Sequence, residues 1–93
     1  MQFLSLSRRK MENPAAFTAE LMAAETARVR QLYSAGTLRQ IWKRGDLAGA
    51  AILWEAATLA DVEAAIESLP IRQAGLLEIV ALVRLEPYPG FGA

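Results

Sequence analysis

Cysteine and histidine are both absent from the 93-residue sequence. Without cysteine the chain has no disulfide bond, no thiolate nucleophile and no zinc–thiolate site. Without histidine it lacks the most common general base and the most common metal ligand. We therefore expect no metal site, and any acid–base chemistry must be carried by other side chains.

An excess of charge of either sign is absent too, because ten basic residues balance ten acidic ones. A neutral chain has no overall field to attract nucleic acid or an acidic membrane, so we expect neither as a partner. The basic run Arg8-Arg9-Lys10 has no interleaved aromatic residues, which argues against nucleic-acid binding. No apolar run approaches 18 residues and no signal-peptide core is present, so we expect a soluble cytoplasmic protein.

Hydrophobic residues, in contrast, are abundant, at 54% of the chain against 22% charged. The length predicts one domain, residues 1–93, with residues 86–93 as a C-terminal arm. A domain this small has a thin core, so the surplus of apolar surface predicts an interface between subunits.

Apolar periodicity and turn residues predict six elements in the order β-α-β-β-α-β. We expect strands at about 2–7, 37–44, 50–57 and 77–85, and helices at about 14–35 and 58–69. This order is typical of an α+β, ferredoxin-like fold, in which a four-stranded antiparallel sheet carries two helices on one face.

Residues that begin and end helices support these boundaries. Asn13 before Pro14 predicts the start of the first helix and Gly36 its end. Thr58 with Asp61 resembles a capping box that starts the second helix, and Pro70 ends it. The expected buried stripe of the second helix is Leu59, Val62, Ile66 and Leu69.

The second face of the predicted sheet is not consistently hydrophilic. In the last strand, Val80 and Leu82 alternate with charged residues on the face opposite Leu77 and Ile79. Two such sheets packed face to face bury these residues, which predicts a homodimer with a shared barrel-like core, or a higher homo-oligomer.

Three stretches of the sequence carry a family resemblance: AETARVRQLYSAGTLRQIWKRGD, AAILWEAATLADVEAAIESLPI and EIVALVRLEPYPGF. In order and spacing they resemble the muconolactone delta-isomerase family from Glu20 to Phe91. The resemblance implies a dimeric α/β barrel, often assembled into larger rings. It also implies cofactor-free isomerisation, by proton transfer, of a small unsaturated lactone acid in aromatic catabolism.

Glu25 lies near the middle of an otherwise apolar arc of the first predicted helix. A carboxylate there must be paired, neutralised or facing a cavity. One interpretation is a shuttling base with a pKa raised by burial, and by its spacing from Gly36 it resembles a helix carboxylate proposed as catalytic in the family. The other interpretation is a structural ion pair with Arg28 or Arg39.

Five further residues are candidates for binding a substrate. An arginine is able to hold a substrate carboxylate in a bidentate manner, whereas aromatic side chains wall a flat pocket and donate hydrogen bonds. The candidates are Arg28, Tyr33, Arg39, Trp42 and Trp54. We expect both tryptophans to face the first helix. The alternative is solvation or an interface for the two arginines and core packing for the three aromatic residues, and it is the more common role of such residues.

Two other functions fit the same fold. One is a non-catalytic binding module or assembly subunit for an aromatic or lactone ligand. The other is a cofactor-free oxygenase or cyclase.

Overall fold

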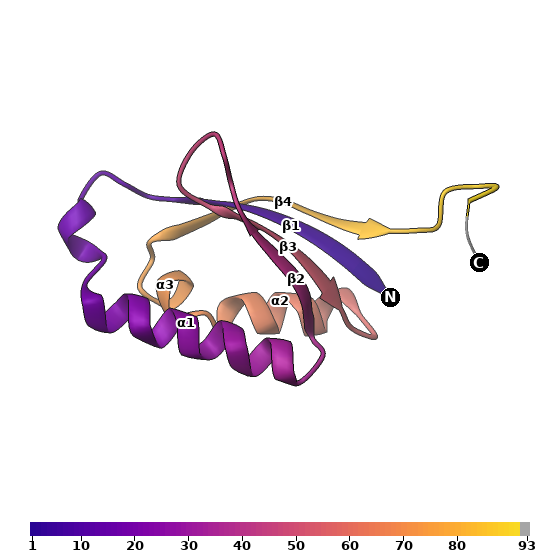
Figure 1. The fold of residues 1–93 in the computed structure, drawn as a ribbon, viewed down its shortest axis with the longest axis horizontal. Coiled ribbons are helices and arrows are strands. Elements are labelled where there is room, and N and C mark those ends of the chain that lie inside the picture. The colour runs from indigo at the N-terminus through magenta and orange to yellow at the C-terminus, as the bar shows by residue number, and fades with distance from the viewer. Residues whose placement is uncertain (92–93) are drawn as a thin grey trace.

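The computed structural model describes residues 1–91 and confirms the α+β, ferredoxin-like arrangement of a four-stranded sheet with helices on one face (Figure 1). All strand pairs are antiparallel, in the order β2-β3-β1-β4. The elements are β1 (Gln2–Arg9), the 3-10 helix η1 (Pro14–Ala16), α1 (Ala19–Ser34), β2 (Leu38–Lys43), β3 (Ala50–Glu55), α2 (Leu59–Glu67), α3 (Pro70–Gln73) and β4 (Leu77–Leu85). The short elements η1 and α3 were not expected.

The start of α1 differs from the prediction. Asn13 makes no side-chain cap, and Pro14 begins the separate turn η1. The backbone of Phe17 leaves the helical region, and Thr18 then caps α1 by accepting a hydrogen bond of 3.1 Å from the Leu21 N–H. Gly36 follows the end of α1 with φ of +81°, the left-handed conformation in which glycine is favoured.

The second helix begins as predicted, with Thr58 accepting a hydrogen bond from the Asp61 N–H at 3.1 Å. Val62, Ile66 and Leu69 are buried, but Leu59 is 47% exposed and is not part of the buried stripe. Leu59 is the first residue of α2, and Ala65 is buried instead. Pro70 does more than end α2, because it is also the first residue of α3.

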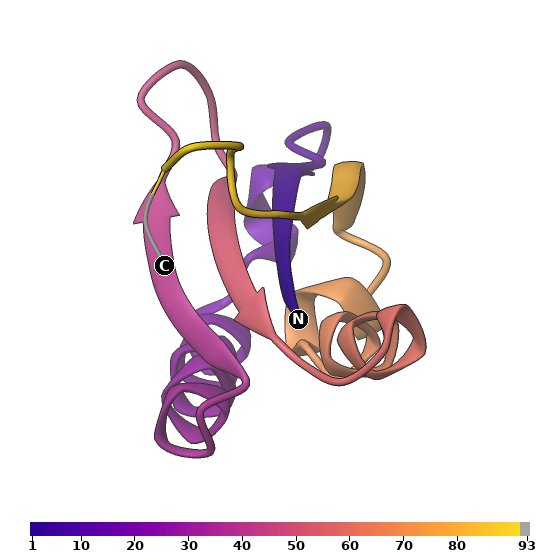
Figure 2. The same cartoon turned by 90° about the vertical axis from the view of Figure 1, so that its right-hand side faces the viewer.

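The two faces of the sheet have different environments (Figure 2). On the face toward the helices, Phe3 is opposite Trp54 and Ser5 is opposite Ile52. All four are buried, and they form the centre of the core together with Leu38 and Val62. On the outer face, Leu4 is opposite Leu53 and Val83, and no part of the chain within residues 1–91 covers them.

A register shift in β2 separates the two tryptophans. Leu38 is opposite Trp54, but after an irregularity between Leu38 and Gln40, Trp42 is opposite Ala51. A one-residue shift moves a side chain to the other face of a sheet, so Trp42 points away from α1. The expectation that both tryptophans face the first helix is therefore wrong for Trp42.

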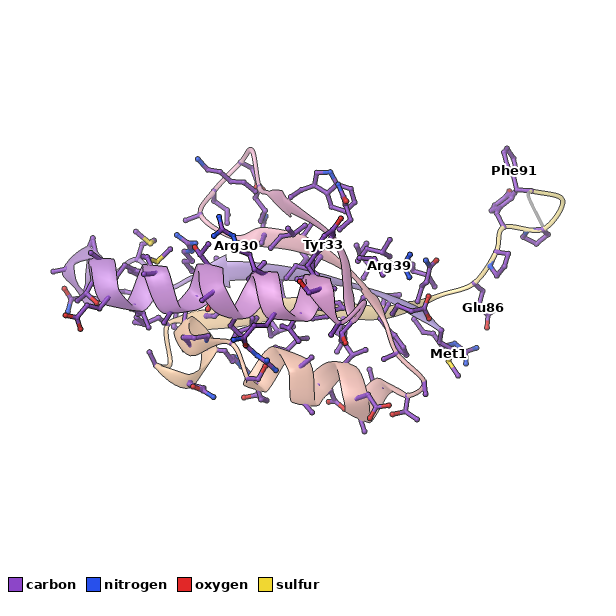
Figure 3. All side chains as sticks on the ribbon, turned by 60° about the horizontal axis from the view of Figure 1, so that its bottom comes forward. Met1, Arg30, Tyr33, Arg39, Glu86 and Phe91 are labelled. Carbon is purple, nitrogen blue, oxygen red and sulfur yellow. The ribbon has the colours of Figure 1, made fainter. Side chains whose placement is uncertain are left out.

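Beyond β4 the chain leaves the sheet at the end where Met1 lies (Figure 3). The rings of Tyr88 and Phe91 pack edge to face, 5.9 Å apart, and both are largely exposed. Of the predicted arm, residues 92–93 lie outside the described part. Within residues 1–91, no helix is long and apolar enough to cross a membrane.

Candidate active site

A cavity of about 280 Å³ lies between α1, α3 and the inner face of the sheet. This volume is close to the lower end of small-molecule pockets, about 300 Å³. Its apolar walls are formed mainly by Met22, Val29, Ile41, Ile52, Leu69, Ile71 and Leu77. Its polar side chains are Ser7, Arg9, Glu25, Thr26 and Arg30. The cavity therefore suits a small, largely apolar molecule with few polar groups.

Glu25 extends from the middle of α1 into this wall, and only 9% of it is exposed. Its Oε1 atom accepts a hydrogen bond of 3.0 Å from the backbone N–H of Ile71, in the first turn of α3. First-turn N–H groups have no partner within their own helix, so Glu25 satisfies one that is buried. The unexpected helix α3 thus supplies the partner of the carboxylate in the apolar arc.

Burial is the largest influence on the Glu25 carboxyl and raises its pKa above the ordinary 4.5. The Ile71 N–H and the positive charge of Arg9 act in the opposite direction and offset part of this rise. The second oxygen, Oε2, accepts no hydrogen bond from the described residues, and no buried side-chain polar atom among them lacks a partner. Oε2 is therefore accessible to solvent from the cavity side or the surface.

The ion pair considered for Glu25 is not formed with either candidate arginine. Arg28 Nε donates to Ser68 Oγ at 2.9 Å, and Arg28 Nη1 donates to Gln31 Oε1 at 3.1 Å. Arg39 is exposed on β2 and makes no salt bridge within the described part of the chain. Glu25 is consequently held by a backbone N–H, and the positive charge that lowers its pKa is that of Arg9.

The structure does not bring the five predicted binding residues to the Glu25 cavity. Tyr33 is 62% exposed, Trp42 is 49% exposed on the outer face, and Trp54 is buried with its Nε1 donating to Ser5 Oγ at 2.8 Å. Figure 3 shows Arg30 near the middle of α1, with Tyr33 and Arg39 farther toward the Met1 end of the molecule. Arg28 borders a different hollow, with Glu55 and Asp61. None of these five residues lines the Glu25 cavity within the described chain. Their contact with a substrate therefore stays a prediction.

Two arginines that line the cavity were missed. Arg9 is the last residue of β1, which was predicted to end at Ser7. The alternation of Phe3, Ser5, Ser7 and Arg9 places Arg9 on the inner face. Extending the predicted strand by two residues would have identified Arg9 from the sequence. Arg30 is five residues after Glu25 on α1.

The hairpin between β2 and β3 is fixed against the end of β1 beside the cavity. The Arg9 N–H donates to the Ala48 carbonyl at 2.9 Å, and Arg44 Nη1 donates to the Ser7 carbonyl at 3.2 Å. Gly49 lies so close to β1 that a Cβ there would be 2.1 Å from the Ser7 carbonyl oxygen. Glycine is thus required where the hairpin closes over the cavity.

This arrangement has the groups needed to exchange a proton and to hold an anion, namely one nearly buried carboxylate and two arginines in an apolar hollow. Residues 1–91 bring together no three His, Cys, Asp or Glu side chains able to hold a metal ion. The sequence pattern that matches the chain, over residues 2–88, is that of muconolactone delta-isomerase. The chain belongs to the muconolactone delta-isomerase family.

Among solved structures, this family member is similar to 5-chloro-2-hydroxyhydroquinone dehydrochlorinase from Burkholderia phenoliruptrix AC1100, in complex with 2,5-dihydroxybenzoquinone. The TM-score is 0.69 at 21% identity, over 92% of this chain and 94% of that one. This likeness confirms the predicted fold. Among curated proteins, none matches the sequence.

Proposed function

We propose that this member of the muconolactone delta-isomerase family shifts a double bond in a small unsaturated lactone acid by cofactor-free proton transfer, with Glu25 as the base. Family membership supports an enzyme that processes a small molecule. The observation that carries the finer proposal is the position of Glu25, a nearly buried carboxylate on the wall of an apolar cavity with one oxygen held by the Ile71 N–H.

The chemistry requires one group that first accepts and then donates a proton. Glu25, as the carboxylate, removes a proton from a carbon activated by conjugation with the lactone carbonyl, and the electron pair moves into a dienolate. The protonated Glu25 then returns a proton to another carbon of the conjugated system, so the product is an isomer and the base is regenerated. A pKa raised by burial favours the first step, because the carboxylate is a stronger base than an exposed one, and the same group then donates the proton as its conjugate acid.

The surroundings of Glu25 support this cycle. The Ile71 N–H fixes Oε1, which leaves Oε2 as the oxygen available to a bound molecule. Arg9 and Arg30 place positive charge in the cavity where the dienolate carries negative charge. The apolar walls limit water around the reacting carbon.

We include in this proposal a homodimer, or a larger assembly built from it, joined through the outer face of the sheet. On that face Val83 is 50% exposed and the opposite residue Leu4 is 38% exposed, while Trp42, on the edge strand β2, is 49% exposed. Apolar patches of this kind are uncommon on monomers, and packing one sheet on the same face of a second copy buries them. Such an isologous contact closes with two-fold symmetry.

Two signals measured together test the isomerase. Muconolactone and related unsaturated lactone acids are incubated with the protein in D₂O, and ultraviolet absorbance and deuterium incorporation are followed. We expect Glu25→Gln to lose about 100-fold or more in both signals, since general base catalysis contributes roughly 10²–10⁴-fold. Glu20→Gln, an exposed position of the same helix, is the matched control and retains both.

The same experiment separates the other functions. Near-normal turnover by Glu25→Gln contradicts the role of Glu25. A ligand that quenches tryptophan fluorescence without any deuterium exchange indicates a binding module. Consumption of dioxygen during turnover indicates an oxygenase.

A further inference from the structure

Arg9 differs from the other arginines of the sheet in having a side chain directed into the cavity without a carboxylate partner. Its neighbour Arg8 points to the opposite face and pairs with Glu78. Other arginines are paired within a few residues of themselves, Arg44 with Asp46 and Arg84 with Glu86. Within residues 1–91, Arg9 makes no salt bridge.

The backbone and the ring of an aromatic residue fix the position of Arg9. Its Cα is paired with that of Leu77 across β4, and its N–H donates to the Ala48 carbonyl at 2.9 Å. Its guanidinium carbon lies 5.7 Å from the centre of the Phe17 ring. Stacking on a ring orients a guanidinium without using its N–H donors, so they remain free for a ligand.

The charges that line the cavity are unbalanced. Arg9 and Arg30 contribute two positive charges, and the ionised Glu25 contributes one negative charge. Arg30 is exposed, whereas Arg9 is half-buried against the cavity wall. An unpaired, half-buried guanidinium beside apolar walls is matched best by a small planar anion attached to an apolar body.

We propose that Arg9 binds the carboxylate of the substrate and thereby directs the ring of the substrate toward Glu25. The inference rests on the proposed function for the reaction, and it assigns the residue that holds the carboxylate of the lactone acid, which is tested without turnover. A planar carboxylate takes two parallel hydrogen bonds from a guanidinium, which a neutral amide cannot do. Arg9 is a binding and specificity residue in this arrangement, and Glu25 remains the base.

Binding of an unreactive pair of compounds tests the inference directly. The probes are 2-furylacetate, a flat five-membered ring with a carboxymethyl group, and its neutral counterpart 2-furylacetamide, each titrated by isothermal calorimetry. We expect the wild-type protein to bind the acid at least about tenfold more tightly than the amide, because hydrogen bonds to charged groups contribute about 1.5–3 kcal/mol. Equal affinities, or no binding of either probe, overturn the inference.

Variants at adjacent positions locate the effect. Arg9→Gln should abolish the preference for the acid, and Arg9→Lys should keep only part of it, because lysine retains the charge but lacks the planar fork. Arg8→Gln is the matched control on the opposite face and should keep the full preference. An unchanged preference in Arg9→Gln overturns the inference, and thermal unfolding verifies that each variant is folded.

Kinetics distinguish failure of this inference from failure of the proposed reaction. With a lactone acid that turns over, Arg9→Gln should raise KM about tenfold or more with a smaller change in kcat. If Arg9→Gln turns over the lactone acid with an unchanged KM, the isomerase proposal stands and the binding role of Arg9 is contradicted. If the protein binds 2-furylacetate in a manner that depends on Arg9 but exchanges no deuterium with any lactone acid, the binding role of Arg9 stands and the isomerase proposal is contradicted.

Discussion

The Oε1 atom of Glu25 and the backbone N–H of Ile71 form a hydrogen bond of 3.0 Å that joins α1 to α3. Both residues are buried and both line the cavity. One contact therefore orients the proposed base and also satisfies a first-turn N–H that has no partner within its own helix. Changes at Glu25 are expected to affect stability as well as chemistry, and the two effects are separable.

The hydrogen bond to the Ile71 N–H requires an acceptor at residue 25 but not a charge. Glu25→Gln keeps an oxygen for the Ile71 N–H, whereas Glu25→Ala leaves this buried donor without a partner. We expect the alanine variant to have a free energy of unfolding about 1–3 kcal/mol below that of the glutamine variant, the typical penalty for an unsatisfied buried group. Urea denaturation at neutral pH measures the difference, and equal midpoints would show that this hydrogen bond does not stabilise the fold.

Burial of Glu25 also predicts a pH dependence of stability. Its pKa is higher in the folded protein than the ordinary 4.5, so the folded state binds the proton more tightly than the unfolded state. The stabilising contribution of this group is then largest below the ordinary pKa and decreases as pH rises through the folded pKa. We expect the free energy of unfolding of the wild type, relative to Glu25→Gln, to decrease as pH rises from the ordinary pKa of 4.5 through the raised pKa of the folded state. Urea denaturation across this range checks it, and a constant difference contradicts it.

The sequence predicted the main elements because their signals are local. The Thr58–Asp61 cap and the conformation of Gly36 each depend on neighbouring residues. The alternation in β4 was predicted only in part, because a register shift places Leu82 on the inner face with Leu77 and Ile79, where the sequence predicted the outer face. The position of Glu25 on an apolar arc likewise identified the buried carboxylate. Its partner was not predictable, since Ile71 is 46 residues away and belongs to a four-residue helix.

The remaining errors arise where one residue changes a register or an element boundary. Trp42 lies on the outer face because of a shift between Leu38 and Gln40, which strict alternation does not anticipate. Arg9 was missed because β1 continues two residues beyond its predicted end. Asn13-Pro14 has the composition of a helix start, but the cap at Thr18 is the one that begins α1.

The two glycines of the hairpin provide a matched comparison of backbone packing. A Cβ at Gly49 would lie 2.1 Å from the Ser7 carbonyl oxygen, whereas a Cβ at Gly45 meets no atom within 4 Å. We expect Gly49→Ala to destabilise the protein by about 1–3 kcal/mol, as overpacking does, and Gly45→Ala to have little effect. Thermal unfolding of both variants measures this, and similar midpoints would show that the hairpin moves away from β1 without penalty.

The outer face of the sheet predicts how the chain associates. Val83 is 50% exposed on that face, opposite Leu4, so a glutamate there would place a charge within the proposed interface. We expect the wild type to sediment as a dimer or larger assembly at micromolar concentration and Val83→Glu to sediment as a monomer, because an unpaired charge is costly to bury. Leu59→Glu is the control, since Leu59 is similarly exposed but lies on α2, on the helix side of the sheet. A wild type that remains monomeric, or a Val83→Glu variant that associates as the wild type does, contradicts an interface on this face.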